Sequence, residues 1–245
     1  MGGDSYRRGF AELVGAFALT FVGAGAVMTS GGNLLAVAAA HGLILAIMVS
    51  ALGHISGGHF NPAVTFGFLV TARIDPILAV LYWVAQLVGA ALAALILKWI
   101  FPNAIVGQAK LGAPALSDQI AVAPGFVLEI VMTFFLVWVV FATAADPRGA
   151  FKSIAGFAIG LTIGADILLG GPLTGAAMNP SRAFGPELAA WEWADAWIWY
   201  VGPLIGGGLA AVAYELLYLR PLRPLPVGPP ESGVEEPRPG ETAVS

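Results

Sequence analysis

The chain has 245 residues, of which 58% are hydrophobic and 11% charged, with a mean hydropathy of +0.83 and a net charge of −4. Such a composition excludes an ordinary soluble domain, because too little polar surface remains to cover one, and it favours a membrane protein with several spans. The sequence contains no cysteine, which excludes disulfides and thiolate metal sites.

Six apolar stretches are long enough to cross a bilayer, since about 20 apolar residues span its hydrocarbon core as a helix. In chain order they are residues 9–30, 34–53, 76–97, 123–145, 153–170 and 196–218. The first and the fourth each carry one ionisable residue near the start, Glu12 and Glu129. The sequence therefore predicts an all-α membrane protein with six transmembrane helices.

Two shorter stretches begin with Asn-Pro, at Asn61-Pro62 and at Asn179-Pro180. Asn is a favoured N-cap and Pro suits the first helical position, so each pair predicts the start of a helix. The uncharged stretch 62–70 would be roughly 14 Å long as a helix, which is about half a bilayer. Each pair is therefore expected to open a re-entrant half-helix.

The two halves of the chain repeat one another. The Asn-Pro pairs are 118 residues apart (179 − 61), and Glu12 and Glu129 are 117 apart (129 − 12). Each half holds an odd number of spans, so the second half must enter the membrane from the opposite side as an inverted 3+3 repeat. The expected units are 1–122, 123–218 and a Pro-rich, disordered tail over 219–245.

Lysine and arginine are enriched on the cytoplasmic side of membrane proteins. An inside N-terminus leaves only Lys98, Lys110 and Arg182 outside. It places eight basic residues inside: Arg7, Arg8, Arg73, Arg148, Lys152, Arg220, Arg223 and Arg238. Both termini are therefore expected in the cytoplasm, and without a targeting signal a plasma or inner cell membrane is the expected location.

Half-helices that enter from opposite faces meet near the midplane with their positive ends facing one point. The amides of Asn61 and Asn179 would cap these ends and keep their NH₂ groups free to donate into the lumen. Non-helical backbone at this depth is tolerated where it lines a wet cavity or is packed in protein. The pattern predicts a narrow aqueous pore that repels cations and accepts small neutral molecules.

The two Asn-Pro boxes, Glu12, Glu129 and the inverted halves resemble the aquaporin (major intrinsic protein) family over about residues 7–219. The resemblance implies a passive water channel in the lipid bilayer and a homotetramer, without enzymatic activity, cofactor, metal or nucleic acid. It also implies that the two glutamates accept N–H groups of the re-entrant loops. The second box has Ser181 where the family usually has Ala, and little effect is expected because the hydroxyl can bond within the first helical turn.

The resemblance places a selectivity filter at His41, Ile167, Ala176 and Arg182, a set similar to that of plant tonoplast intrinsic proteins. Arg182 is a permanent cation with five donors, and His41 can donate or accept a hydrogen bond. Ile167 makes the wall more apolar and slightly wider than a second His would. Ammonia or hydrogen peroxide is therefore expected to pass along with water.

Two alternatives stay open. A glycerol or urea facilitator is opposed by Ala183, where glycerol facilitators have Asp, and by the pair Trp199-Tyr200, which matches water-type members. A proton-coupled transporter would use Glu12 and Glu129 as a proton relay. The carboxylate of Asp166 is expected to pair with Lys98 or Lys110 or to reach water.

Overall fold

The computed structural model describes residues 3–148 and 154–222. Six of the helices in this part of the chain are long and apolar enough to cross a membrane. They are α1 (Gly3–Thr29), α2 (Leu34–Ser56), α4 (Pro76–Ile100), α6 (Val122–Val140), α7 (Ala155–Thr174) and α9 (Trp197–Tyr214). The predicted all-α fold with six spans is confirmed.

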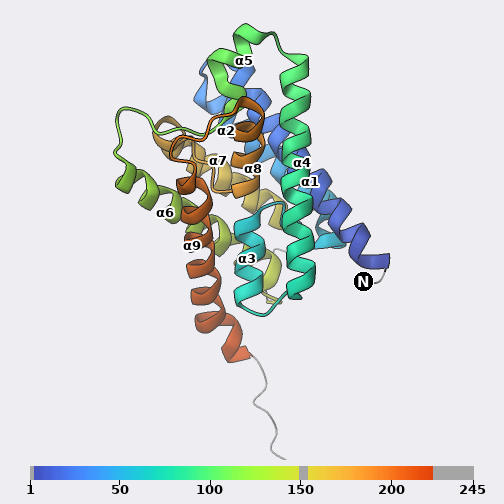
Figure 1. The fold of residues 1–245 in the computed structure, drawn as a ribbon. Helices are drawn as coiled ribbons and strands as arrows, with labels where there is room; N and C mark the ends of the chain where they lie inside the picture. The colour runs from blue at the N-terminus through green and yellow to red at the C-terminus, as the bar shows by residue number, and fades with distance from the viewer. Residues whose placement is uncertain (1–2, 149–153, 223–245) are drawn as a thin grey trace, which may run out of the picture.

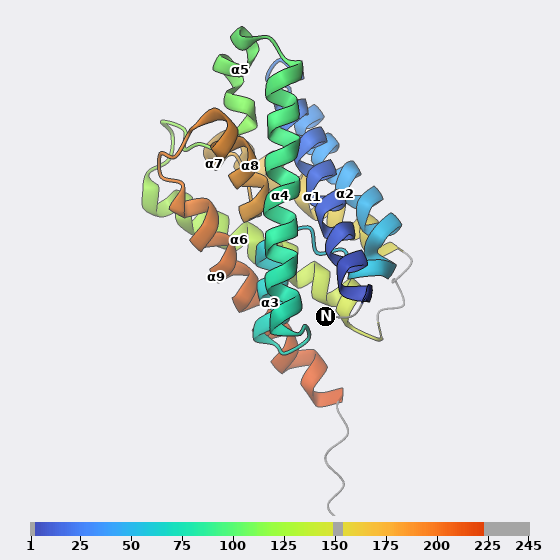
Figure 2. The same ribbon diagram turned by 45° about the vertical axis from the view of Figure 1, so that its right-hand side comes forward.

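Two half-helices, α3 (Pro62–Val70) and α8 (Pro180–Ala190), lie inside the bundle. In both views α8 lies above α3 beside the long helix α4 (Figures 1 and 2). With 9 and 11 residues they are too short to cross a bilayer. Their amino ends face each other, because Asn61 and Asn179 each donate a hydrogen bond to the loop that precedes the other helix.

Local sequence determines where several helices begin. The Asp75 carboxylate accepts from the N–H groups of Ile77 and Leu78 at 2.9 and 3.1 Å, and Pro76 occupies the first turn of α4. Asn33 caps α2 in the same way by accepting from Ala36 N–H at 3.1 Å. These caps satisfy N–H groups that have no partner within the helix.

The ends of the spans differ from the predicted bounds. α1 includes Arg7 and Arg8 and α4 includes Lys98, because long basic side chains at a helix end can reach water without interrupting the helix. α7 runs through Asp166 to Thr174 and contains Pro172, whose missing N–H falls in the last turn.

The connection between α4 and α6 holds a short helix, α5 (Asn103–Ala109), followed by a 3₁₀ turn over Lys110–Gly112. π-helical turns extend α6 through Phe141–Ala145 and α9 through Glu215–Leu219. The inner end of α9 continues as a 3₁₀ turn over Arg220–Leu222, so the first four residues of the expected disordered tail are helical. The rest of that tail, 223–245, and Lys152 lie outside the described residues.

The helices approach each other closely at glycines that repeat between the halves. A Cβ atom on Gly89 of α4 would lie 2.3 Å from the Leu13 carbonyl oxygen of α1. A Cβ atom on Gly206 of α9 would lie 2.2 Å from the Ile130 carbonyl oxygen of α6. Gly206 follows Gly89 by 117 residues (206 − 89), so the same helix contact is built twice.

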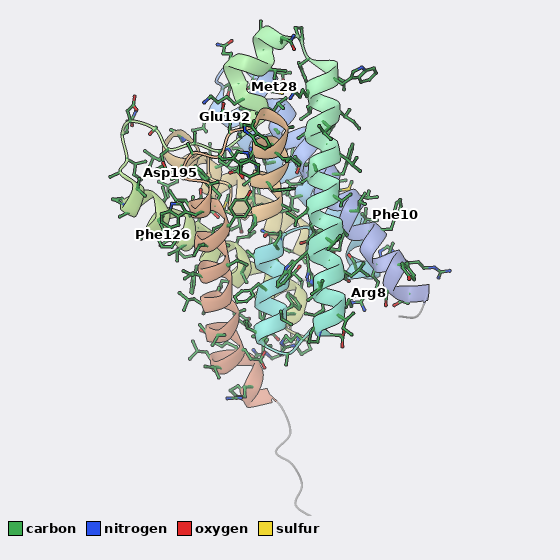
Figure 3. All side chains as sticks on the ribbon, viewed as in Figure 1. Arg8, Phe10, Met28, Phe126, Glu192 and Asp195 are labelled. Atoms are coloured by element: carbon green, nitrogen blue, oxygen red, sulfur yellow. The ribbon has the colours of Figure 1, made fainter. Side chains whose placement is uncertain are left out.

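Large apolar side chains cover the outside of the bundle. Phe10 is 66% exposed and points away from the helices in Figure 3. Arg8 lies near the end of the molecule where the chain begins, whereas Met28, Glu192 and Asp195 lie toward the opposite end (Figure 3). An apolar surface of this kind is suited to lipid rather than to water.

Candidate pore and selectivity filter

Glu12 holds the loop that leads into α3. Its Oε1 accepts from Ser56 Oγ at 2.6 Å and from His59 N–H at 2.9 Å, and its Oε2 accepts from Phe60 N–H at 2.6 Å and from Gln86 Nε2 at 2.8 Å. A buried carboxylate is tolerated when its oxygens are filled by donors in this way.

Glu129 holds the loop that leads into α8 by the same bonds. Its Oε1 accepts from Thr174 Oγ at 2.6 Å and from Ala177 N–H at 3.1 Å, and its Oε2 accepts from Met178 N–H at 2.9 Å. Each of these donors follows its counterpart in the first half by 118 residues. The two loops are therefore anchored equivalently, although the first has Gln86 as an additional donor.

The residue before each asparagine has a left-handed backbone. Phe60 has φ 48° and Met178 has φ 51°, values that are unfavourable for side chains larger than glycine. The two N–H groups donate to Glu12 and Glu129, so the anchoring carboxylates hold these strained conformations. The strained turn directs each backbone carbonyl toward the opposite half-helix.

Asn61 and Asn179 bridge the two half-helices at their amino ends. Asn61 Nδ2 donates to the Met178 carbonyl and Asn179 Nδ2 donates to the Phe60 carbonyl, each at 2.9 Å. An amide NH₂ carries two hydrogens, so one on each asparagine is used for this crossed pair. The expectation that the whole NH₂ group is free was too broad, because only the second hydrogen remains for a solute.

Ser181 adds a bond that the first half lacks. The Oδ1 atom of Asn179 accepts from Ser181 N–H at 3.0 Å, from Ser181 Oγ at 2.8 Å and from Arg182 N–H at 3.2 Å. Asn61 Oδ1 accepts from Ala63 N–H at 2.8 Å. The hydroxyl thus bonds within the first helical turn, where it supports the asparagine.

Arg182 and His41 form a buried polar pair. The Nε and Nη2 atoms of Arg182 lie 3.3 Å from His41 Nε2, and Arg182 Nη1 donates to the Gly112 carbonyl at 2.8 Å. His41 Nδ1 lies 2.9 Å from the Val37 carbonyl, which can only accept. This bonding pattern assigns the proton to Nδ1, leaving Nε2 as an acceptor in a neutral ring.

A cavity of about 390 Å³, here called the outer cavity after the predicted orientation, opens onto this pair, and its wall includes His41, Ile167 and Arg182. Ala176 is buried but is not part of that wall, where Gly175 lies instead. Three of the four filter positions therefore share one cavity.

Two further cavities continue the path. A narrow space of about 10 Å³, here called the inner constriction, is lined by Leu19, Leu45, Gly58, His59, Asn61, Val64, Leu136, Val140, Ile159, Ile163 and Asn179. Beyond it lies an inner mouth of about 560 Å³, whose wall includes Val49, Gly53 and Ala155.

One face of α2 and one face of α7 follow this path. His41, Leu45, Val49 and Gly53 succeed each other every four residues from the outer cavity to the inner mouth. Ile167, Ile163, Ile159 and Ala155 do the same along α7. Residues four apart lie on one helix face, so both helices line the path along their length.

Sequence reasoning did not find several supporting residues. Gly112 supplies the carbonyl that holds Arg182, and Gln86 bonds both Glu12 and Thr65. Trp199, noted only as a marker of water-type members, donates to the Thr174 carbonyl at 3.0 Å. A buried Gln in an apolar span is a recognisable signal, whereas nothing local marks Gly112 as the partner of Arg182.

Asp166 makes neither of the ion pairs considered for it. Lys98 Nζ donates to the Ala189 carbonyl at 2.6 Å, and Lys110 pairs with Glu192 at 2.9 Å. Asp166 is 8% exposed, and its Oδ2 has no hydrogen-bond partner within the described ranges 3–148 and 154–222.

Residues 3–214 match the protein family described as Major intrinsic protein. A probable aquaporin TIP-type alpha from Phaseolus vulgaris is 46% identical over 234 residues, covering 91% of this chain and 89% of the relative. Aquaporin TIP1-1 from Zea mays is 46% identical over 224 residues, covering 87% of each. The solved structure of an aquaglyceroporin from Plasmodium falciparum has a TM-score of 0.79 at 23% identity, over 89% of this chain and 98% of that one, and this likeness shows the shared fold alone.

Proposed function

The chain belongs to the major intrinsic protein family, the aquaporins, and from this premise we propose how its water pore selects what passes. It is a passive water channel and an integral, multi-pass membrane protein. We assign it no catalytic role, since the family consists of channels.

The crossed pair of Asn61 and Asn179 carries the proposal. Two helix amino ends face one point, and each asparagine has one N–H left to donate there. A water molecule at this point would accept through its oxygen and orient its hydrogens away from both helix ends. This orientation and the two positive ends disfavour cations, as in aquaporin-type channels.

We assign the outer filter to His41, Ile167, Ala176 and Arg182. Arg182 has five N–H donors, of which the His41 ring and the Gly112 carbonyl occupy part, so the remainder can face a solute. Its permanent charge repels cations. Ile167 offers no polar group, so ammonia and hydrogen peroxide are the neutral solutes we expect beside water.

Two alternatives are weaker. A glycerol or urea facilitator is opposed by the buried Ala183, at a position where glycerol facilitators have Asp, and by the pair Trp199-Tyr200, which matches water-type members. A proton-coupled transporter would need Glu12 and Glu129 to exchange protons with the lumen. Their oxygens are instead occupied by donors from the loops that they hold.

Our proposal extends to assembly and location. We place the chain as a homotetramer with one pore in each protomer, in a cell membrane with both termini in the cytoplasm. The orientation is supported by the distribution of basic residues, because the side that we assign to the cytoplasm has eight of them and the opposite side has three.

Replacing His41 with Trp is expected to lower the water permeability of proteoliposomes to near that of protein-free liposomes, because the larger indole would obstruct the passage beside Arg182. Stopped-flow light scattering under an osmotic gradient measures the water permeability. Parallel gradients of glycerol, urea and ammonia measure how permeable the channel is to each of these solutes.

The matched control places the same bulk outside the path, as Gln108→Trp on the exposed face of α5. It should keep the wild-type rate. Wild-type permeability in the His41→Trp variant would show that His41 is not part of the filter. Fast glycerol flux through the wild-type protein would favour the glycerol facilitator.

A further inference from the structure

The inverted repeat gives every position of the outer filter a counterpart in the other half. The bonds of Ser56 to Glu12 and of Thr174 to Glu129 are equivalent and lie 118 residues apart (174 − 56). The bonds that the N–H groups of Phe60 and Met178 donate have the same spacing (178 − 60). A shift of 118 residues therefore relates α2 and α3 to α7 and α8.

Under this shift, each residue of the outer filter corresponds to a residue on the inner side of the asparagine pair. The counterparts of His41, Ile167, Ala176 and Arg182 are Ile159, Val49, Gly58 and Val64. None of the four has a polar side chain. The path thus has a polar outer set and an apolar inner set in equivalent places.

The inner set lies around the smallest of the three cavities along the path. Gly58, Val64 and Ile159 line the inner constriction of about 10 Å³, and Val49 lines the inner mouth that follows. The outer cavity, of about 390 Å³, is far larger in volume. The equivalent positions differ in side-chain polarity, and the outer cavity is in addition lined by connecting loops, at Gly32 and Pro114.

A space of about 10 Å³ is at the lower limit for one water, which also needs two to four polar partners. The two asparagines supply partners at one end of the constriction. His59 also lines it, but its Nδ1 lies 3.0 Å from Thr65 Oγ1 and its ring packs against Phe68 and Tyr82, so Nε2 is the ring nitrogen that remains for a solute. The remaining walls are glycine and aliphatic side chains, and apolar constrictions resist wetting.

We propose that the inner constriction sets the rate of water flow, whereas the outer filter selects the solute. The inference rests on the water-channel function and adds a second, apolar determinant to it. Water that passes the asparagine pair must give up hydrogen bonds over the stretch lined by Val64, Val140 and Ile159, and this loss forms the main barrier.

Two variants test the proposal by different means. Val140→Thr adds a hydroxyl to the wall with little change in width. Ile159→Ala widens the wall without adding a polar group. The matched control is Val27→Thr, which makes the same chemical change in the wall of the wide outer cavity. Stopped-flow water permeability is measured on proteoliposomes at several temperatures and divided by the amount of reconstituted protein.

Val140→Thr is expected to raise the water permeability per channel by about two- to tenfold, the effect of one added hydrogen bond, and to lower its activation energy. Ile159→Ala should also raise the rate, and Val27→Thr should leave it unchanged. Elution as a single species identifies folded variants.

The proposal is overturned if folded Val140→Thr and Ile159→Ala both keep the wild-type rate, or if Val27→Thr raises the rate as much as they do. Failure of the underlying function would be seen separately, because wild-type proteoliposomes would then shrink no faster than protein-free liposomes.

Discussion

Glu12 and Glu129 show how a carboxylate can lie inside a membrane protein in a structural role, without relaying protons. A carboxylate within a span is expensive and by default suggests function. Here each one accepts three hydrogen bonds from the loop that it holds or from the helix leading into it, and Glu12 accepts a fourth from Gln86. Their role is to position Asn61 and Asn179.

At the carboxyl end of α6, after the π-helical turn, Asp146 joins α6 to α9. It accepts from Arg148 Nη2 at 2.7 Å and from Tyr214 OH of α9 at 3.1 Å. The Arg148 side chain lowers the pKa of Asp146 to about 2. The ionised form is therefore favoured by folding, and its stabilising effect is complete above the ordinary Asp pKa and is lost as pH falls toward 2.

Asp146→Asn is expected to lower the thermal unfolding midpoint in detergent at pH 7, because the charged partner of Arg148 and Tyr214 is removed. The difference from wild type should shrink as pH falls from about 4 to 2, where the wild-type carboxylate is itself protonated. Fluorescence-monitored melting at fixed heating rate measures both midpoints.

The exposed Asp118→Asn serves as the matched control and should change the midpoint little at either pH. An Asp146→Asn difference that stays constant between pH 7 and pH 2 would rule out the ion pair as its source.

At the scale of elements, each half-helix is defined by its ends. Asn and Pro start α3 and α8 near the centre of the bundle. The long helices pack closely around α3 and α8. The glycine contacts of α1 with α4 and of α6 with α9 set the distance between these helices. A substitution at one such contact should lower the stability of the protein more than it changes solute selectivity.

Gly206→Ala is expected to destabilise the protein by about 1–3 kcal/mol, because the new methyl group would overlap the Ile130 carbonyl and force α6 and α9 apart. A lower apparent melting midpoint in detergent would report this. Gly107→Ala provides the comparison, since no atom lies within 4 Å of its added Cβ. Equal midpoints for the two variants would show that the close contact is unimportant.

At the scale of the whole molecule, the inverted repeat produces one path with two different ends. The same backbone plan carries Arg182 and His41 at one cavity and Val64 and Ile159 at the other. In our proposal, these equivalent places have different functions because their side chains differ in polarity.

The absence of cysteine from the whole chain predicts that mercury does not inhibit water flow, since thiolates are its usual targets. Water permeability of proteoliposomes should be unchanged by mercuric chloride. Ile167→Cys, which places a thiol in the outer cavity, should make the channel sensitive. Wild-type inhibition that a thiol reagent reverses would contradict the prediction.

The sequence by itself determined the six spans, the two half-helices and the inverted repeat. These features depend on local quantities: the length of apolar runs, the caps at Asn61 and Asn179, and the spacing of repeated residues. The family resemblance then placed His41, Ile167 and Arg182, which the fold brings to one cavity.

Only the tertiary structure decided which groups meet. It brought the Gly112 carbonyl to Arg182, used one N–H of each asparagine for the opposite loop, and left Asp166 without the expected lysine. It also set the volumes of the outer cavity and the inner constriction. These outcomes depend on distances between segments far apart in the chain, which the packing of all the helices together establishes and which no local pattern encodes.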